Sequence, residues 1–367
     1  MRKYTIAVYA ICKNESKFIK RWYDSIKEAD VICVLDTGST DDSWQILKSL
    51  PNVIIKQQIF NPWRFDDARN ESLNMVPQNI DLCLCIDLDE VAQQGWRQAI
   101  EKVWQNDTTL GQYISNYSFD KQGNPETTLV NARLHNRHDY HWIYPIHEVL
   151  EFIGVKENII TIPNMVINHY PDLTKSRSQY LNLLELAVAE MPDNPRQKLL
   201  LMGEYYGYHK YDEVIKVGHE FLAYDRNKLY LYDISRAERD MGKAYLAKQY
   251  YEEAELWLLK AHQDTPDIRE PLAELGYFYF EINDYQKSRK YLLKTLAIKE
   301  RSTSSINEAD AWGQKVYDYL SCACYHLQKY KEALTYCNKS LALDPNNQNT
   351  INNLNLIKTA INDWENK

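Results

Sequence analysis

Residues 82–90 read LCLCIDLDE, an apolar run that ends in three carboxylates. The run is apolar at every position, which is typical of a strand that is buried on both faces of a parallel sheet. Side chains alternate along a strand, so Asp87 and Asp89 are expected to point to the same side. Glu90 then points to the other side, where we expect it to cap a following helix. The run therefore predicts an α/β domain with two paired aspartates beyond one strand.

The segments that precede this run alternate in the same way. Short apolar runs predict strands, and longer stretches with apolar residues at helical spacing predict helices. The expected strands are YTIAVYAI (4–11), VICVLD (31–36) and NVIIKQQI (52–59), and the expected helices are SKFIKRWYDSIK (16–27), TDDSWQILKSL (40–50) and FDDARNESLNMV (65–76). This order implies a parallel sheet, whose ligands bind beyond the carboxyl ends of the strands. Asp36 and the Asp87/Asp89 pair both lie at such ends.

The chain beyond about Tyr180 has a different pattern, because it is continuously helical and repeats itself. Gly242 and Leu258 recur after 34 residues as Gly276 and Leu292, and after a further 45 as Ser321 and Cys337. The second interval equals 34 plus an insertion of 11 residues (45 − 34). Small residues at this period, an aromatic before each second helix and the closing DPNN (344–347) resemble the tetratricopeptide repeat. Such repeats stack into a superhelix with a concave binding surface, whereas an unrelated helical bundle is the alternative.

These two patterns divide the chain into parts. We expect an α/β domain at 1–172, a connecting helix within 173–196 and a repeat domain at 197–367. The fold class is thus α/β followed by all-α.

Composition excludes some functions. The chain has 367 residues and a net charge of −8, and this acidic balance argues against a nucleic-acid partner. No apolar run approaches the ~20 residues of a transmembrane helix, and the apolar start lacks a cleavage site. The seven cysteines have no metal-site spacing, so we expect reduced cysteines in a cytoplasmic protein.

Crowded carboxylates such as Asp87 and Asp89 are typical of a site for Mg²⁺ or Mn²⁺. A cation held by few protein ligands keeps positions open for diphosphate oxygens. The alternative is that Asp89 is the N-cap of a helix.

Four segments taken together resemble the family-2 glycosyltransferases, which are inverting nucleotide-sugar enzymes with a Rossmann-like domain of the GT-A type. The segments are AICKNESKFIKRWYDSI (10–26), VICVLDTGSTDDSWQIL (31–47), FDDARNESLN (65–74) and LCLCIDLDEV (82–91). With the repeats added, the chain resembles bacterial members joined to a tetratricopeptide region. That group includes lipopolysaccharide-core-type transferases and peptide S-glycosyltransferases.

The resemblance implies a donor site on the first four strands. Glu15, Asp36, Asp66, Arg69 and Asp87 are expected to bind the nucleotide-sugar, with UDP as the expected nucleotide. The family commonly has two aspartates after its second strand, whereas Thr37 follows Asp36 here, which leaves the choice of nucleotide open. The alternative for Glu15 is that it is a solvated acid with no binding role. The alternative for Arg69 is that it only forms an ion pair with Asp66.

The resemblance also implies a general base for the acceptor, because inversion requires a base opposite the leaving diphosphate. Similar enzymes carry a His-Glu pair after the acidic strand, which in HWIYPIHEVLEF (141–152) is His147-Glu148. Glu148 is expected to be the base and His147 its neighbour. The alternative for Glu148 is that it only forms a salt bridge across the sheet. Asp139 and Glu151 are weaker candidates for the base.

Histidines supply the last candidate ligands. His169 is expected to join Asp89 and Asp87 at the metal, and is otherwise a core histidine bonded to a backbone carbonyl. His135, His138 and His141 lie three residues apart, a spacing that zinc sites use, but a polar loop explains them better.

The expected function is metal-dependent transfer of a hexose from a nucleotide-sugar to a peptide, protein or glycan acceptor. The repeats would present that acceptor or build a homodimer. The alternative is a non-catalytic scaffold with a decayed transferase domain.

Overall fold

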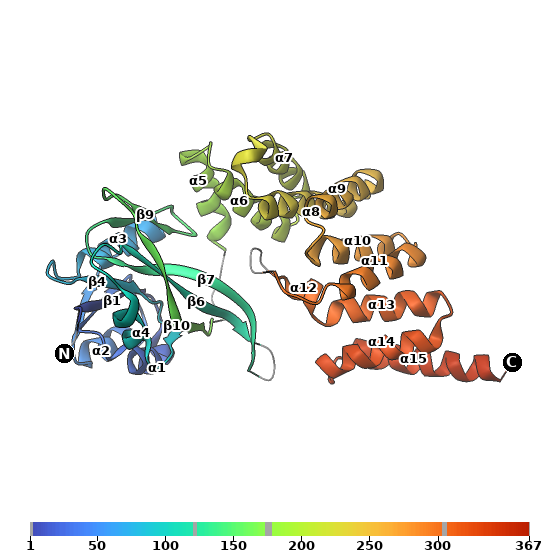
Figure 1. The fold of residues 1–367 in the computed structure, drawn as a ribbon, viewed down its shortest axis with the longest axis horizontal. Helices are drawn as coiled ribbons and strands as arrows, with labels where there is room; N and C mark the ends of the chain where they lie inside the picture. The colour runs from blue at the N-terminus through green and yellow to red at the C-terminus, as the bar shows by residue number, and fades with distance from the viewer. Residues whose placement is uncertain (1–2, 120–122, 173–177, 303–306, 367) are drawn as a thin grey trace. The chain divides into compact units, whose positions relative to one another are not determined.

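The computed structural model describes residues 3–119, 123–172, 178–302 and 307–366. The chain divides into two compact units, Met1–Glu190 and Met191–Lys367, each of which is described by itself (Figure 1). Residues 173–177 of the expected connecting segment lie outside the described residues. The rest of that segment includes α5 (Tyr180–Glu190), which belongs to the first unit.

The first unit is an α/β domain, as its sequence predicts. Its strands are β1 (Ile6–Cys12), β2 (Val31–Asp36), β3 (Val53–Gln57), β4 (Leu82–Cys85), β5 (Glu90–Ala92), β6 (Leu110–Phe119), β7 (Pro125–Asn136), β8 (Tyr140–Ile143), β9 (Val149–Phe152) and β10 (Ile159–His169). Its remaining helices are α1 (Ser16–Ile26), α2 (Ser43–Ser49), α3 (Phe65–Asn74) and α4 (Trp96–Val103).

Eight strands form one sheet in the order β3-β2-β1-β4-β7-β6-β10-β5, and β8 and β9 form a separate hairpin. The first four strands are parallel, as expected. The expectation of a parallel sheet is wrong for the other half, because β7 runs antiparallel to both β4 and β6. The carboxyl end of β4 is therefore bordered by β7, a strand of opposite direction.

The central strands are buried on both faces. Leu82, Leu84 and Ile86 pack into the core beneath α1 and α4, whereas Cys83 and Cys85 face the core beneath α3. This alternation explains why the run that ends in Asp87 is apolar at every position.

The second unit is all-helical in its described residues. Its elements are α6 (Pro195–Gly207), α7 (Tyr211–Leu222), a 3-10 turn (Arg226–Lys228), α8 (Leu231–Ala247), α9 (Tyr251–Asp264), α10 (Glu270–Glu281), α11 (Tyr285–Ala297), α12 (Ala309–Trp312), α13 (Gln314–His326), α14 (Tyr330–Leu343) and α15 (Gln348–Glu365). Four helix pairs stack in order, and α15 follows the last pair (Figure 1).

Small residues allow the helices of each pair to approach closely, as the repeat predicts. A Cβ atom added to Gly242 would lie 2.7 Å from Leu258, and one added to Gly276 would lie 2.5 Å from Leu292. In the last pair, the Ser321 hydroxyl donates to the Ala333 carbonyl. The repeated columns of the sequence are thus the contact points of the helix pairs.

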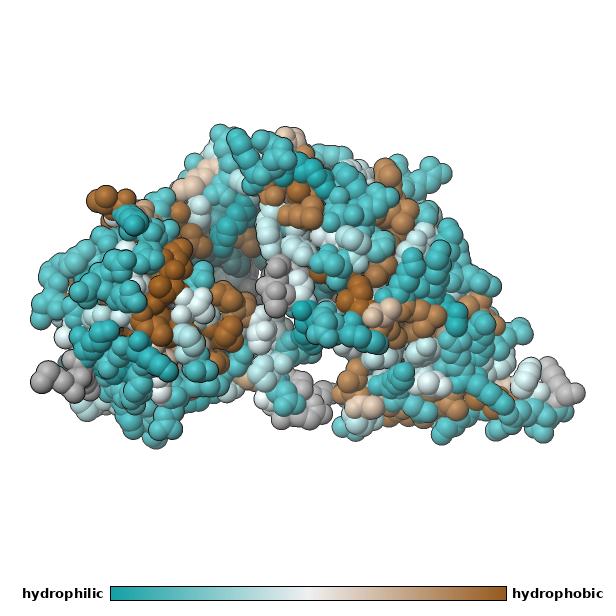
Figure 2. Space-filling model, viewed as in Figure 1, coloured by the Kyte–Doolittle hydropathy of each residue, from teal (hydrophilic) through white to brown (hydrophobic). Residues whose placement is uncertain are grey.

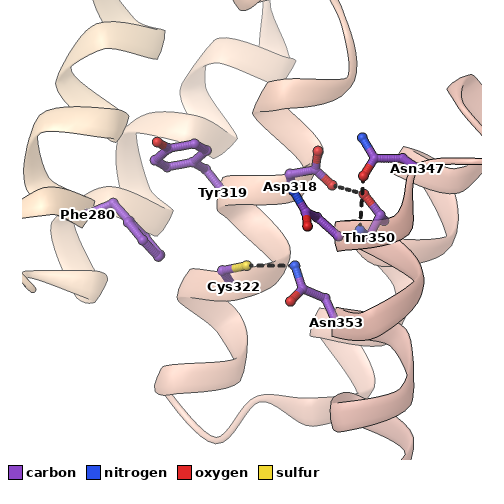
Figure 3. Close-up of a pocket in the computed structure, with 8 residues that line it drawn as sticks. Phe280, Asp318, Tyr319, Cys322, Asn347, Thr350 and Asn353 are labelled. Atoms are coloured by element: carbon purple, nitrogen blue, oxygen red, sulfur yellow. Dashed lines mark hydrogen bonds between the residues drawn. The ribbon is translucent and has the colours of Figure 1, made fainter.

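We call the surface made by α8, α10 and α13, the first helices of the last three pairs, the first-helix face. A cavity of about 240 Å³ opens between α10, α13 and α15, and Figure 3 shows Phe280, Tyr319, Cys322 and Asn353 around it. The short α12 contacts α10 and α13 beside it.

The surface of the first unit carries exposed apolar side chains on its long strands. Ile114 pairs with Val130 across β6 and β7, and these side chains are 42% and 59% exposed. Figure 2 shows apolar surface over this strand region. Among the described residues, no helix is both long and apolar enough to cross a membrane.

Candidate functional site

The turn after β1 is tied to the loop after β2. The Asn14 side-chain oxygen accepts hydrogen bonds from the backbone N–H groups of Thr40 (2.7 Å) and Asp41 (3.3 Å). The Ser43 hydroxyl accepts the backbone N–H of Glu15 at 2.8 Å. Glu15 is 7% exposed, so the alternative of a solvated acid is wrong. These bonds fix Glu15 beside the carboxyl end of β2.

Asp36 ends β2 and is fully buried. One carboxylate oxygen accepts hydrogen bonds from the N–H groups of Gly38 and Ser39 and from the Gln57 amide. Burial would raise the pKa of this carboxyl, but these bonds bring the pKa below its ordinary value. The other oxygen, Oδ2, is buried without a partner among the described residues. A buried acceptor of this kind fits a hydroxyl or N–H donor of a ligand.

Two arginines hold Asp87. The Arg69 guanidinium donates to both carboxylate oxygens, with Nη2 2.9 Å from Oδ2, and Arg133 Nη1 also lies 2.9 Å from Oδ2. Burial would raise the pKa of Asp87, but the two guanidinium groups hold it far below its usual range. Both oxygens are thus bonded, which leaves Asp87 poorly placed to bind a cation in this arrangement.

The same arginine connects Asp87 to Glu148. Arg69 is 4% exposed, and its Nε lies 2.9 Å from a Glu148 carboxylate oxygen. The expected alternative, an Arg69–Asp66 pair, is not formed, since both oxygens of Asp66 accept from Arg64. Arg69 therefore joins the end of β4 to the residue before β9, although the two lie 61 residues apart (148 − 87).

Sequence reasoning missed Arg133. It lies on β7, and β7 pairs with β4 through Leu84 and Leu134. No local motif distinguishes this arginine, because only the antiparallel pairing of β4 and β7 brings it to Asp87.

Glu90 does not cap a helix, so that expectation is wrong. Its backbone N–H bonds to the Asp87 carbonyl at 2.9 Å, and the chain then enters β5. The Glu90 carboxylate accepts the Asp87 backbone N–H at 2.8 Å. Burial raises the pKa of Glu90 to about 7. The helix-cap alternative for Asp89 is also wrong, since α4 begins only at Trp96.

Asp89 and His169 lie together, with His169 Nε2 3.4 Å from Asp89 Oδ2. The Tyr117 carbonyl lies 3.3 Å from His169 Nδ1, and the Tyr117 ring stacks on the imidazole. Burial would lower the pKa of His169, but its hydrogen bonds to the Asp89 carboxylate and the Tyr117 carbonyl raise it. A metal ion at Nε2 would take the place of the proton there, while the carbonyl would keep Nδ1 as the donor, which is the usual arrangement of a metal-ligating histidine.

These donors fit a divalent cation that takes its other ligands from elsewhere. Carboxylate oxygen and imidazole nitrogen suit Mn²⁺, and carboxylate oxygen suits Mg²⁺. The described residues hold no group of three or more metal-ligating side chains. The described residues would thus supply two ligands to such an ion, from Asp89 and His169.

His147, beside Glu148, has an unusual backbone. Its φ of 51° lies in the left-handed region, which is uncommon for residues other than glycine. Its ring meets the Tyr180 ring of α5 edge-on at 6.1 Å. The Glu148 side chain is 9% exposed, so the loop between β8 and β9 holds a nearly buried carboxylate.

The other candidates do not gather at this site. His135 is buried and bonds to the Tyr9 hydroxyl, whereas His138 is exposed and His141 pairs with Glu151. The three histidines thus form no shared site. Asp139 bonds to Asn136, which pairs with Leu82 at the opposite end of β4 from Asp87.

Comparisons with known proteins match a different family to a part of each unit. The family described as Glycosyl transferase family 2 matches residues 7–155, and the family described as Tetratricopeptide repeat matches residues 314–347. No curated protein matches the chain.

Several solved structures are similar to the chain over about half its length. MamA is 18% identical, and TTC0263, a thermophilic TPR protein in Thermus thermophilus, is 19% identical. The matches cover 48% and 50% of this chain and 96% and 90% of those chains, with TM-scores of 0.37 and 0.36.

Proposed function

Because the chain joins a domain of glycosyl transferase family 2 to a tetratricopeptide-repeat region, we propose that it is a metal-dependent, inverting hexosyltransferase. The donor is a nucleotide-sugar with UDP as its nucleotide. The acceptor is a peptide, protein or glycan that the repeats present. The seven cysteines of this chain form no disulfide, which suits a reducing compartment. We therefore assign the protein to the cytoplasm.

The arrangement around Arg69 carries the proposal. One buried guanidinium bonds to Asp87 at the end of the acidic strand and to Glu148, the candidate base. A bidentate guanidinium–carboxylate contact fixes both partners in direction as well as distance. Arg69 thereby holds the candidate base at a set distance from the β4–β5 turn, in which Asp89 lies. We assign Arg69 and Asp87 to positioning.

The donor half of the site rests on Asp36, Asp89 and His169. The unpartnered oxygen of Asp36 accepts a hydroxyl or N–H of the nucleoside. Glu15, whose backbone N–H bonds to Ser43 at the start of α2, is assigned to the same donor site. Asp89 and His169 are the residues that would hold Mn²⁺ or Mg²⁺. When bound, such an ion supplies positive charge to the leaving diphosphate.

Glu148 acts on the acceptor. It accepts the proton of the acceptor hydroxyl or thiol as that oxygen or sulfur forms a bond to the anomeric carbon. The bond from the anomeric carbon to the diphosphate oxygen breaks, and its electron pair leaves with UDP. Attack from the side opposite the diphosphate inverts the anomeric centre.

Ligand-dependent stabilisation tests the donor site. We expect UDP with Mn²⁺ to raise the melting temperature of the wild-type protein, because a ligand that binds the folded state stabilises it. Asp89→Asn should lose the Mn²⁺-dependent part of this shift. Asp24→Asn, which alters an exposed pair with Lys20, serves as the control and should keep it. A scaffold with a decayed transferase domain predicts no shift in any of the three proteins.

A further inference from the structure

The insertion that interrupts the repeat spacing lies between α11 and α13, where the structure describes residues 298–302 and 307–313. Glu308 and α12 lie against α8 and α10. These helices belong to the first-helix face, so a segment of the chain itself covers part of that face.

Two side chains of the insertion bind to the face through specific contacts. The Glu308 carboxylate accepts two hydrogen bonds from the Arg239 guanidinium, at 2.7 and 3.0 Å. The Trp312 indole N–H donates to Glu270 Oε1 at 3.0 Å, and the Glu308 backbone N–H donates to the same oxygen. The Arg269 guanidinium lies 3.8 Å from the centre of the Trp312 ring.

The contact with Arg239 is a true ion pair. Arg239 is 4% exposed and Glu308 is 32% exposed at its side chain. Burial would raise the pKa of Glu308, but Arg239 holds it at about 2. The face therefore offers a buried positive charge to a carboxylate and a flat cation to an aromatic ring.

The insertion does not satisfy these groups completely. Arg239 Nε and Glu270 Oε2 are both buried without a partner among the described residues. Arg289 shows the complete form of such a contact in the same unit, since its Nε and Nη2 both bond to Glu332. Unpaired buried donors and acceptors are costly, so a better-fitting occupant of this face would gain free energy.

We propose that Arg239, Arg269 and Glu270 form a recognition site for a partner peptide that carries a carboxylate and, four residues later, an aromatic ring. Residues 307–312 occupy this site in cis. The inference goes beyond the transferase reaction and does not rest on it, because it concerns binding alone.

Between the two anchors, Asp310 makes polar contacts at the surface of the face. Asp310 is exposed, its backbone carbonyl accepts the Tyr277 hydroxyl at 2.6 Å, and its carboxylate pairs with Lys315 of α13 at 2.5 Å. Tyr277 packs on Tyr319, which lines the cavity shown in Figure 3. A longer partner peptide thus meets this cavity next to the site.

Fluorescence anisotropy of a labelled peptide with the sequence of residues 307–316 tests the proposal on the full chain. Glu308→Ala with Trp312→Ala removes the anchors of the occupant. The double variant should bind the peptide about tenfold more tightly than the wild type, because the site no longer has to be vacated first. Adding Arg239→Met should abolish this gain. Glu332→Ala, which removes the carboxylate of the Arg289 pair, should bind like the wild type.

Equal binding by the double variant and the wild type would overturn the proposal, provided that helicity and melting temperature show a folded repeat unit. A second measurement on the wild-type chain covers the case in which the variant does not fold. Excess unlabelled peptide should accelerate amide hydrogen exchange at residues 308–312 by displacing them. A scrambled peptide should not. Unchanged exchange with the matching peptide means that the insertion is a fixed structural element, and the proposal fails.

Discussion

Each unit of the molecule contains a buried arginine–carboxylate cluster, and the two clusters differ in how completely their groups are paired. In the first unit, Arg69 and Arg133 together bond to both oxygens of Asp87, and Arg69 also bonds to Glu148. In the second unit, the Nε of Arg239 and one oxygen of Glu270 have no partner among the described residues.

The difference teaches what each cluster is suited to do. A buried ion pair with every group bonded is costly to open and fixes the positions of the chains that it joins. A buried ion pair in which some donors and acceptors have no hydrogen-bond partner is less stable. The segment that occupies such a site is therefore easier to replace. We therefore assign positioning of the candidate base to the first cluster and exchangeable recognition to the second. The following predictions test this contrast, beginning with the largest expected effect.

Replacing Glu148, the candidate base, tests the catalytic role assigned to the first cluster. Glu148→Gln keeps the size of the side chain and can accept a hydrogen bond from Arg69, but it accepts no proton from the acceptor. We expect kcat to fall about 10³-fold, within the range for loss of a general base, while donor binding stays unchanged. Steady-state kinetics and donor titration measure the two quantities. Glu151→Gln, at an exposed position of β9 in the same hairpin, is the control, and an equal loss there would remove Glu148 from its assigned role.

Removing Arg69 should cost stability as well as activity. Arg69→Met leaves Asp87 and Glu148 without their shared cation, so we expect the first unit to lose about 3–5 kcal/mol of unfolding free energy. Arg133→Met should cost less, because Asp87 keeps two bonds to Arg69 and Arg133 is partly exposed. Urea unfolding compares the two variants. Equal losses would mean that the cluster is not organised around Arg69.

The pH dependence of the first unit should report on a buried histidine beside the acidic strand. His135 Nε2 accepts the Tyr9 hydroxyl, and its Nδ1 donates to the Asn136 carbonyl, so the ring is held neutral. Burial lowers the pKa of His135 to about 4. The unfolded chain then binds more protons than the folded one between pH 6.5 and 4, so stability falls as the pH falls through this range.

The expected loss is roughly 3 kcal/mol by pH 4. His135→Gln should reduce the loss of unfolding free energy between pH 6.5 and 4, whereas His138→Asn, at an exposed position, should leave that loss unchanged. Urea unfolding at several pH values measures the unfolding free energy of each protein. A fall of the same size in His135→Gln would assign the effect to other groups.

Much of the fold could be predicted from the sequence because its signals are local. The strand run LCLCI is apolar on both faces, and the repeat columns mark Gly242 and Gly276 as contact points. The mixed half of the sheet could not be predicted in this way. Its direction depends on the pairing of β7 with β4, which lies outside any local pattern.

The candidate site shows the same contrast between local sequence signals and long-range pairing. The motifs predicted Asp36, Arg69 and Asp87 as site residues, but they did not predict the bonds that these side chains make. Arg133 reaches Asp87 only through sheet pairing. Asp66, which heads the same helix as Arg69, bonds instead to Arg64. Sequence therefore indicates which residue types gather, and the three-dimensional pairing decides which of them are already bonded.

The smallest effect is expected in the second cluster. Glu308→Gln keeps a hydrogen-bond acceptor for Arg239 but loses the charge, and the carboxylate is partly exposed. We expect the unfolding free energy of the second unit to fall by only about 1 kcal/mol. Urea unfolding measures the change. A loss as large as that of Arg69→Met would mean that the two clusters do not differ in the way described.

The anomeric configuration of the sugar released from an α-linked UDP-hexose tests the central claim most directly. Proton NMR in the presence of Mg²⁺, which does not broaden the signals as Mn²⁺ does, can follow hydrolysis of the donor before the free sugar equilibrates. Attack opposite the diphosphate predicts that the β-hexose appears first, at a rate that falls in Glu148→Gln. An α-hexose as the first product, or no turnover with any of the common nucleotide-sugars, would contradict an inverting transferase with Glu148 as its base.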